Sequence, residues 1–207
     1  MPTPARTSLE QIVKAGREIV ETDGIDGLTM QSIAARVGVK APSLYKRIRS
    51  RNDLLRLVAN DAAAELTGNL EEVVAGQDAR RDLAHLAHTF RRFAHANPGA
   101  YSLIFAPLPD DARADAGWSV KASAPVIDTT ERLAGTDHAL EAARTVVAWA
   151  NGFIAMELAG AFRLGGDVDR AFDYGIDRLG VAIDAGQRPP PGPPGEAEMT
   201  QGDDIQG

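Results

Sequence analysis

LTMQSIAARVGVKAPSLYKRIRSRNDLL, residues 28–55, decides the fold, because it predicts a helix, a glycine turn and a short basic helix in succession. The core side of the first helix is formed by apolar residues at helical spacing, which are Met30, Ile33, Ala34 and Val37. Thr29 comes directly before this run, where its hydroxyl can cap the helix. Gly38 tolerates the left-handed backbone that ends a helix. This order is the layout of a helix-turn-helix motif.

The second helix of the motif is expected to start around Ala41, with Pro42 in its first turn, where a missing N–H costs no helical hydrogen bond. Leu44 and Ile48 point to the core at helical spacing. The opposite face presents hydroxyl, cationic and aromatic side chains, which are Ser43, Lys46, Arg47 and, to one side, Tyr45. Such a mixture suits phosphates and base edges, so the motif predicts a DNA-binding surface.

Charge is distributed unevenly along the chain. Residues 36–51 contain six basic and no acidic side chains, and residues 1–55 contain nine basic and six acidic ones. The whole chain nevertheless carries a formal net charge of −7. An acidic body with one basic end is expected to orient toward a polyanion. A solvated charged helix face is the alternative interpretation, and the coincidence of the charge with the turn geometry favours DNA binding.

The stretch from about Ser8 to Ala63 resembles the N-terminal DNA-binding domain of TetR-type transcriptional regulators. The matching features are, in order, Ile12, Ala15, Ile19 and Val20 before Asp23-Gly24, then Leu28-Thr29, Ile33-Ala34, Val37-Gly38-Val39, Ser43-Leu44-Tyr45 and Arg51-Asn52-Asp53-Leu54-Leu55. Residues 46–48, Lys-Arg-Ile, stand where the family usually has an aromatic-rich stretch. The resemblance implies DNA contacts at Thr29, Lys40, Ala41, Pro42, Ser43, Tyr45, Lys46, Arg47 and Arg51. It also implies that Thr29 and Tyr45 bind phosphate and that residues 41–43 meet bases.

Beyond residue 55 the chain keeps helical periodicity and shows no alternating strand pattern. Ser50 and Asp53 predict a capping box at the start of a further helix. Helices are predicted over residues 51–75, 78–96, 97–106, 110–134, 137–164 and 168–185. The expected architecture is all-α, with an N-terminal three-helix helix-turn-helix DNA-binding domain (1–55) and a C-terminal helical bundle for dimerisation and effector binding (56–186). Residues 187–207 have almost no large apolar side chain and are predicted to be a disordered tail.

Residues 146–178 are similar to the C-terminal domain of a TetR subgroup that carries a Trp-His-Gly motif. Trp149 and Gly152 match the motif, and Asn151 occupies the place of its histidine. The resemblance implies that the last two long helices pair with those of a second subunit in a symmetric homodimer. The pattern alone leaves open whether this helix lies inside its own subunit. The apolar residues at helical spacing are Val147, Ile154, Leu158 and Ala161.

Most aromatic side chains also lie in the second part of the chain. The TetR resemblance implies that this part binds a small-molecule effector, whose identity the sequence does not give, and it implies no other cofactor. An ordinary core position is the alternative for each aromatic residue. The candidate ligand-binding residues are Phe93, Trp118, Trp149 and Met156.

Metal binding and catalysis are not predicted. His88 and His95 lie two turns apart on one predicted helix, about 10 Å, too far for one ion to bridge, and His85 lacks an obvious further ligand. The chain contains no cysteine, which excludes disulfides and thiolate chemistry. It has no glycine-rich phosphate loop, nucleophile elbow or zinc-protease helix, so no enzyme is expected.

The sequence therefore predicts a sequence-specific transcriptional regulator, most simply a ligand-responsive repressor that binds a palindromic operator as a homodimer. Its expected partners are double-stranded operator DNA, a small-molecule effector and a second copy of the chain. No apolar run is long enough to cross a membrane, and the N-terminus lacks a secretory signal, so a cytoplasmic location is expected. A DNA-binding architectural protein that dimerises without sensing is the rival, and an enclosed cavity in the helical part would discriminate between the two.

Overall fold

The computed structural model describes residues 7–74 and 76–185, and all regular structure in this part is helical. Its α-helices are α1 (Leu9–Gly27), α2 (Met30–Arg36), α3 (Ala41–Leu44), α4 (Arg51–Glu71), α5 (Ala79–Ala96), α6 (Pro98–Phe105), α7 (Ala116–Ala134), α8 (Ala139–Leu158) and α9 (Val168–Ala185). The all-α prediction is confirmed. The predicted disordered tail, 187–207, lies outside the described residues.

The first three helices and the start of α4 enclose a core of their own. Ile12 and Ile19 from α1, Ile33 from α2 and Leu44 from α3 are almost fully buried there. Ser8 caps α1 and Thr29 caps α2, each through a side chain that accepts a backbone N–H three residues ahead. The apolar faces and the Thr29 cap predicted for this motif are therefore confirmed.

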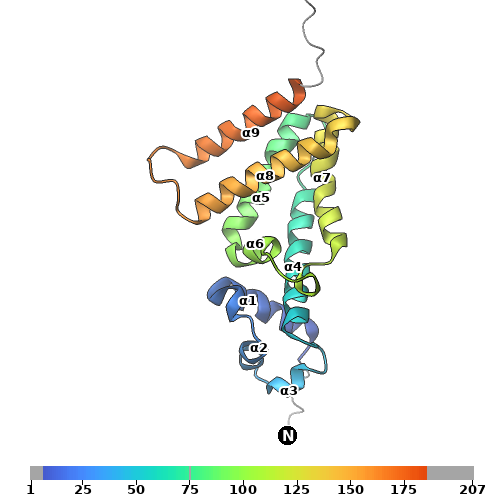
Figure 1. Cartoon of the computed structure of the whole chain (residues 1–207), viewed down its shortest axis with the longest axis vertical. Coiled ribbons are helices and arrows are strands. Elements are labelled where there is room, and N and C mark those ends of the chain that lie inside the picture. Colours follow the sequence, from blue (N-terminus) through green and yellow to red (C-terminus); the bar gives the residue numbers. More distant parts are fainter. Residues whose placement is uncertain (1–6, 75, 186–207) are drawn as a thin grey trace, which may run out of the picture.

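Helix α4 belongs to both halves of the molecule. Leu54 and Val58 are buried in the core of the first three helices, whereas Leu66 and Leu70 are buried in the core of the bundle. Figure 1 shows α4 running from the end that carries α1–α3 into the bundle, with α8 and α9 toward the opposite end. The boundary expected between residues 55 and 56 thus falls within one continuous helix.

Helices α1 and α6 meet closely and join the two cores. The Glu21 carboxylate accepts the backbone N–H groups of Gly99 and Ala100 at 2.8 and 2.9 Å. A Cβ at Gly99 would lie only 2.3 Å from the Val20 carbonyl oxygen. Arg17 adds an ion pair with Glu65 on α4 at 2.7 Å. The first domain is therefore held to the bundle by backbone contact and by charge.

Three predicted helices are clearly shorter in the structure, and the one predicted over 51–75 ends at Glu71. The segment predicted over 110–134 forms a 3-10 turn at 110–112, continues in extended conformation at Arg113, and becomes α7 only at Ala116. The helix predicted over 137–164 ends at Leu158, because Gly160 adopts a positive φ of 62° and the Ala161 N–H bonds back to the Met156 carbonyl. Such a left-handed glycine closes a helix C-terminus.

None of the helices within residues 7–74 and 76–185 combines the length and the apolar character needed to cross a membrane.

Candidate nucleic-acid interface and ligand cavity

The turn between α2 and α3 has the geometry that the sequence predicts. Gly38 has a φ of 71°, in the left-handed region that glycine adopts without steric cost. The Val39 N–H bonds to the Ala34 carbonyl at 2.9 Å, which closes the end of α2. Ala34 is buried, so a larger side chain there would hold the two helices apart. Pro42 lies in the first turn of α3, as expected.

The outward face of α3 and of the residues after it is polar and basic. Leu44 and Ile48 are buried, which fixes the opposite side chains toward solvent. The exposed residues of this face, which we call the recognition surface, are Lys40, Pro42, Ser43, Tyr45, Lys46 and Arg47. Lys40, Lys46 and Arg47 form no ion pair with any described residue, so their charges are available to an anion. Figure 1 places α3 at one extremity of the molecule, where a long polyanion can approach it.

Thr29 and Arg51, two other predicted DNA contacts, form hydrogen bonds within the protein. The Thr29 hydroxyl accepts the Ser32 backbone N–H at 3.0 Å. The Arg51 guanidinium donates to the carbonyls of Leu28 and Ile25 at 2.9 and 2.8 Å. Arg51 therefore ties the start of α4 to the turn before α2. Ala41 is half-buried at the base of the recognition surface.

The predicted capping box at the start of α4 forms only in part. The Ser50 hydroxyl accepts the Asp53 N–H at 3.1 Å, as predicted. The Asp53 carboxylate, however, accepts the N–H of Arg49 rather than that of Ser50, at 3.0 Å, and also binds Arg56 at 2.8 Å. These bonds, first the one from Arg49, lower the pKa of Asp53 below its ordinary value. The carboxylate thus fixes the connection between the recognition surface and α4.

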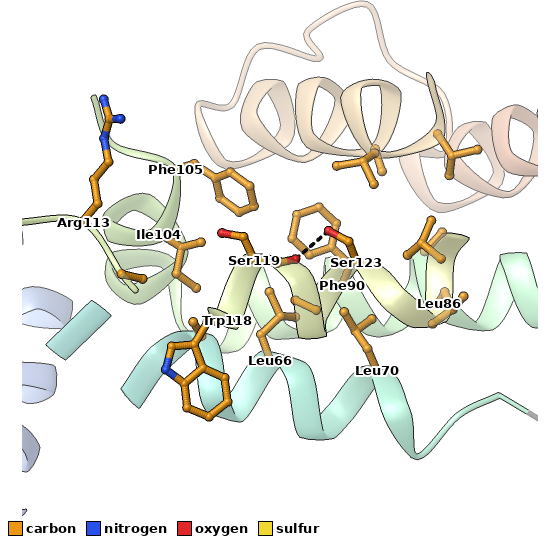
Figure 2. Close-up of a pocket in the computed structure, with 18 of the residues that line it drawn as sticks. Leu66, Leu70, Leu86, Phe90, Ile104, Phe105, Arg113, Trp118, Ser119 and Ser123 are labelled. Carbon is orange, nitrogen blue, oxygen red and sulfur yellow. Dashed lines mark hydrogen bonds between the residues drawn. The ribbon is translucent and has the colours of Figure 1, made fainter. Parts of the chain in front are cut away.

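A cavity of about 530 Å³ lies among α4, α5, α6, α7 and α8. Its wall is mainly apolar, and Figure 2 shows Leu66, Leu70, Leu86, Phe90 and Trp118 around it. Phe105 and Val147 line it and are 44% and 40% exposed, so the cavity opens to solvent beside them. Its size and lining are those of a small-molecule binding site.

Of the four candidate ligand-binding residues, the structure brings only Trp118 to this cavity. Phe93 is buried in the bundle core and borders a smaller polar pocket. Trp149 packs on Phe172 of α9, with ring centroids 5.1 Å apart, and against the backbone of Gly175. Met156 is 49% exposed on the surface of α8. The aromatic side chains that line the cavity with Trp118 are Phe90 and Phe105.

The segment between α6 and α7 links this cavity to the first domain. Arg113 and Ala114 line the cavity, while the neighbouring Asp111 and Asp115 bind α4. Asn52 donates to Asp111 at 3.0 Å. Asn60 donates to the Asp115 carboxylate and accepts the Asp115 N–H, both at 2.7 Å. We call residues 110–115 the linker. The linker therefore contacts both the cavity and α4.

A charged cluster joins α5 to the end of α8 and the start of α9. Arg91 binds Glu157 (Nε to Oε2, 2.9 Å) and Asp169 (2.6 Å), and His95 binds Glu157 at 2.9 Å. The Arg91 bonds, followed by the His95 bond, hold the pKa of Glu157 below its ordinary value of 4.5. Among the described residues no group of three or more potential ligands has the arrangement of a metal site.

Comparison with known proteins identifies the family. The model of bacterial regulatory proteins of the tetR family matches residues 12–58, and that of the tetracyclin repressor-like C-terminal domain matches residues 83–179. An uncharacterised HTH-type transcriptional regulator of Mycobacterium tuberculosis is 30% identical over 184 residues, which are 87% of this chain and 84% of that protein. The chain belongs to the TetR family of transcriptional regulators.

Further relatives of this TetR-family chain are similar in sequence over part of its length or share its fold. The class D tetracycline repressor protein of Escherichia coli is 31% identical over 88 residues, which are 42% of this chain and 40% of the repressor. A protein of unknown function from Rhodococcus sp. RHA1 has the same fold, with a TM-score of 0.76 and 23% identity over 88% of this chain and all of that one. Family membership makes this chain a DNA-binding transcriptional regulator and not an enzyme.

Several residues of the cavity were not distinguished at the level of sequence. Ser119 and Ser123 line it from α7, one turn apart, in a helix face that otherwise carries apolar residues. Both serines are exposed residues, and hydroxyls at exposed helix positions are common, so their spacing gives no signal of a site. Leu66 and Leu86 gave no signal either, since their spacing is that of any buried helix.

Proposed function

We propose that this TetR-family chain is a repressor that binds a two-fold symmetric operator as a homodimer and is released from it by a small molecule in the cavity. The observation that carries this proposal is the position of the cavity. Its wall includes α4 and the linker, and α4 also continues from the recognition surface. Occupancy by a ligand that fits one position of α4 better than another would shift the population between two arrangements of the DNA-binding domain.

The dimer in this proposal forms through the outward face of α8, which is apolar and contains small residues. Val147 and Met156 are 40% and 49% exposed. A Cβ at Gly152 would meet nothing within 4 Å, so this face is open. The exposed small residues at helical spacing are Ala148, Gly152, Ala155 and Ala159. They allow a second helix to approach closely.

These residues differ from the apolar residues at helical spacing that the sequence analysis named, for which the pattern left the subunit interior and the dimer interface both open. Ile154 is fully buried in the bundle of its own subunit, and Ala161 follows the end of α8. Val147 and Leu158 remain exposed and flank the open face. The proposed interface is therefore formed by the side of α8 that faces away from the core.

A dimer is required because one recognition surface reaches few base pairs. Two copies related by a two-fold axis contact successive major grooves, about 34–36 Å apart, and so read a palindrome. Each copy contributes the exposed, unpaired charges of Lys40, Lys46 and Arg47. These charges supply the salt-dependent part of the affinity, whereas Ser43 and Ala41 are proposed to contact base edges.

DNase footprinting on the DNA upstream of the chain's own reading frame, at several salt concentrations, tests this proposal. The expected result is one protected site with two symmetric halves and a dimer by sedimentation of the protein. A protected site without symmetry, bound by a monomer, would refute the dimeric mode. Protection that no small molecule relieves, in a screen of candidate effectors, would favour the architectural rival.

A further inference from the structure

We propose that the cavity takes a neutral, mainly apolar molecule that carries a hydroxyl group, which Ser119 and Ser123 bind. The proposal rests on the assignment of the cavity as the effector site and adds the chemical class of the ligand.

The wall requires a ligand with a large apolar body. Leucines from α4 and α5 form one side, and the Phe90 and Phe105 rings lie 5.7 Å apart, edge to face, on another. Val126 and Val146 continue the apolar lining onto α7 and α8. Each CH₂ group that such a wall removes from water adds to the affinity, so a large aliphatic or ring body is favoured.

The charges of the wall argue against an ionic ligand. None of the lining residues is an aspartate or glutamate, so a buried cation would have no counter-charge. Arg113 is the one lining residue with a positive charge. Its guanidinium binds Asp110 at 3.0 Å, and its side chain is 58% exposed. Figure 2 shows it directed away from Phe90 and the two serines, so it does not neutralise an anion inside the cavity.

The two serines provide a matched donor and acceptor. Ser123 donates its hydroxyl proton to the Ser119 carbonyl at 2.7 Å, which leaves its oxygen free to accept. The Ser119 hydroxyl has no hydrogen-bond partner among the described residues and can donate. Figure 2 shows both serine side chains on α7 beside the Phe90 and Phe105 rings. A ligand hydroxyl can therefore accept from Ser119 and donate to Ser123 while its body lies on the apolar wall.

Isothermal titration calorimetry of the full chain with three ten-carbon probes tests the ligand class. The probes are 1-decanol, decanoate and decylammonium, which share one body and differ in the charge of the head group. We expect decanol to bind at least tenfold more tightly than either ion, because an ion leaves an unpaired charge in the cavity. The double variant S119A/S123A is expected to weaken decanol binding about five- to tenfold, the effect of one or two hydrogen bonds.

Two alanines of α7 give matched controls for the site. Ala122 lines the cavity and Ala124 does not, so A122F is expected to abolish decanol binding and A124F to leave it unchanged. Circular dichroism checks that A122F is folded, and S119A/S123A tests the site independently if it is not.

Each other result has a definite meaning. Binding of either ion as tightly as decanol overturns the ligand class but leaves the cavity as a ligand site. Binding of no probe, or decanol binding that neither A122F nor the serine variant affects, overturns the inference. Tight decanol binding that does not release operator DNA supports the ligand class and refutes the proposed role of the cavity in release.

Discussion

Basic residues of the segment 36–51 serve different functions, although they are alike in the sequence. Lys46 and Arg47 are exposed and bind no described carboxylate, whereas Arg51 is held by two backbone carbonyls. Arg36 is paired with Glu18 of α1 at 3.2 Å. The basic residues of this segment thus form two groups. Some are available to DNA, and others hold in place the helices that carry the first group.

Replacing Lys46 by alanine tests the available charges. K46A is expected to weaken binding to every DNA sequence and to reduce the slope of log K against log salt by about 0.9 for each lysine removed. Fluorescence anisotropy with operator and non-operator DNA at four salt concentrations measures both effects. K121A, on α7 and far along the chain from the recognition surface, is the matched control. An unchanged slope for K46A would remove Lys46 from the phosphate contacts.

A comparison of Arg51→Ala with Arg47→Ala separates positioning from contact. R51A removes the guanidinium that donates to the carbonyls of Leu28 and Ile25 and is expected to lower the free energy of unfolding by about 1–3 kcal/mol. R47A removes an exposed, unpaired side chain and is expected to keep the stability within about 0.5 kcal/mol while weakening DNA binding. Urea unfolding and anisotropy measure the two quantities. Equal stability of the two variants would contradict the positioning function of Arg51.

At the scale of elements, the contact of α1 with α6 connects the DNA-binding domain to the bundle. G99A is expected to destabilise the protein by about 1–3 kcal/mol, because its Cβ would lie 2.3 Å from a backbone oxygen that cannot easily move. G68A is the control, since Gly68 lies within α4 and a Cβ there meets nothing within 4 Å. It is expected to raise stability by about 0.5–1 kcal/mol. Thermal unfolding of both variants checks the opposite signs.

The charged cluster around Arg91 and Glu157 joins the end of α8 to α5, and it predicts that stability depends on pH. Because the pKa of Glu157 is lowered on folding, its stabilising effect is complete above its ordinary pKa of 4.5 and is lost as pH falls through the folded value. E157Q is expected to cost about 2 kcal/mol at pH 7 and less at low pH. Its control is E141Q, an exposed position on the same helix. If the free energy of unfolding fell in parallel for the wild type and E157Q between pH 7 and pH 3, this assignment would be wrong.

Elements with strong local signals were predictable from the sequence, and the cavity was not. Gly38 and Thr29 mark the ends of α2 through their own chemistry, so the motif could be located from residue types alone. The cavity instead depends on side chains from five helices and the linker, whose convergence is set by packing. Trp118 was assigned to it because it is aromatic, and Trp149, selected on the same ground, is instead partly buried against α9.

At the scale of the whole molecule, the proposed dimer makes DNA binding depend on a surface far from the recognition surface. Figure 1 shows α3 at one end of the molecule and α8 toward the other end. A substitution on the open face of α8 cannot touch DNA, so its effect on affinity must act through the second subunit. Linking two recognition surfaces raises affinity by their effective concentration, by a factor of about 10² to 10⁴.

Gly152→Arg tests this dependence. A large charged side chain in the middle of the small-residue row would separate the two subunits, so G152R is expected to sediment as a monomer with an unchanged circular dichroism spectrum. Its operator affinity is expected to fall at least a hundredfold, whereas the salt slope should approach half that of the dimer, because half the phosphate contacts are lost. A124R, an exposed position on α7, controls for the added charge. A G152R protein that remains dimeric and protects both half-sites would place the interface on another surface.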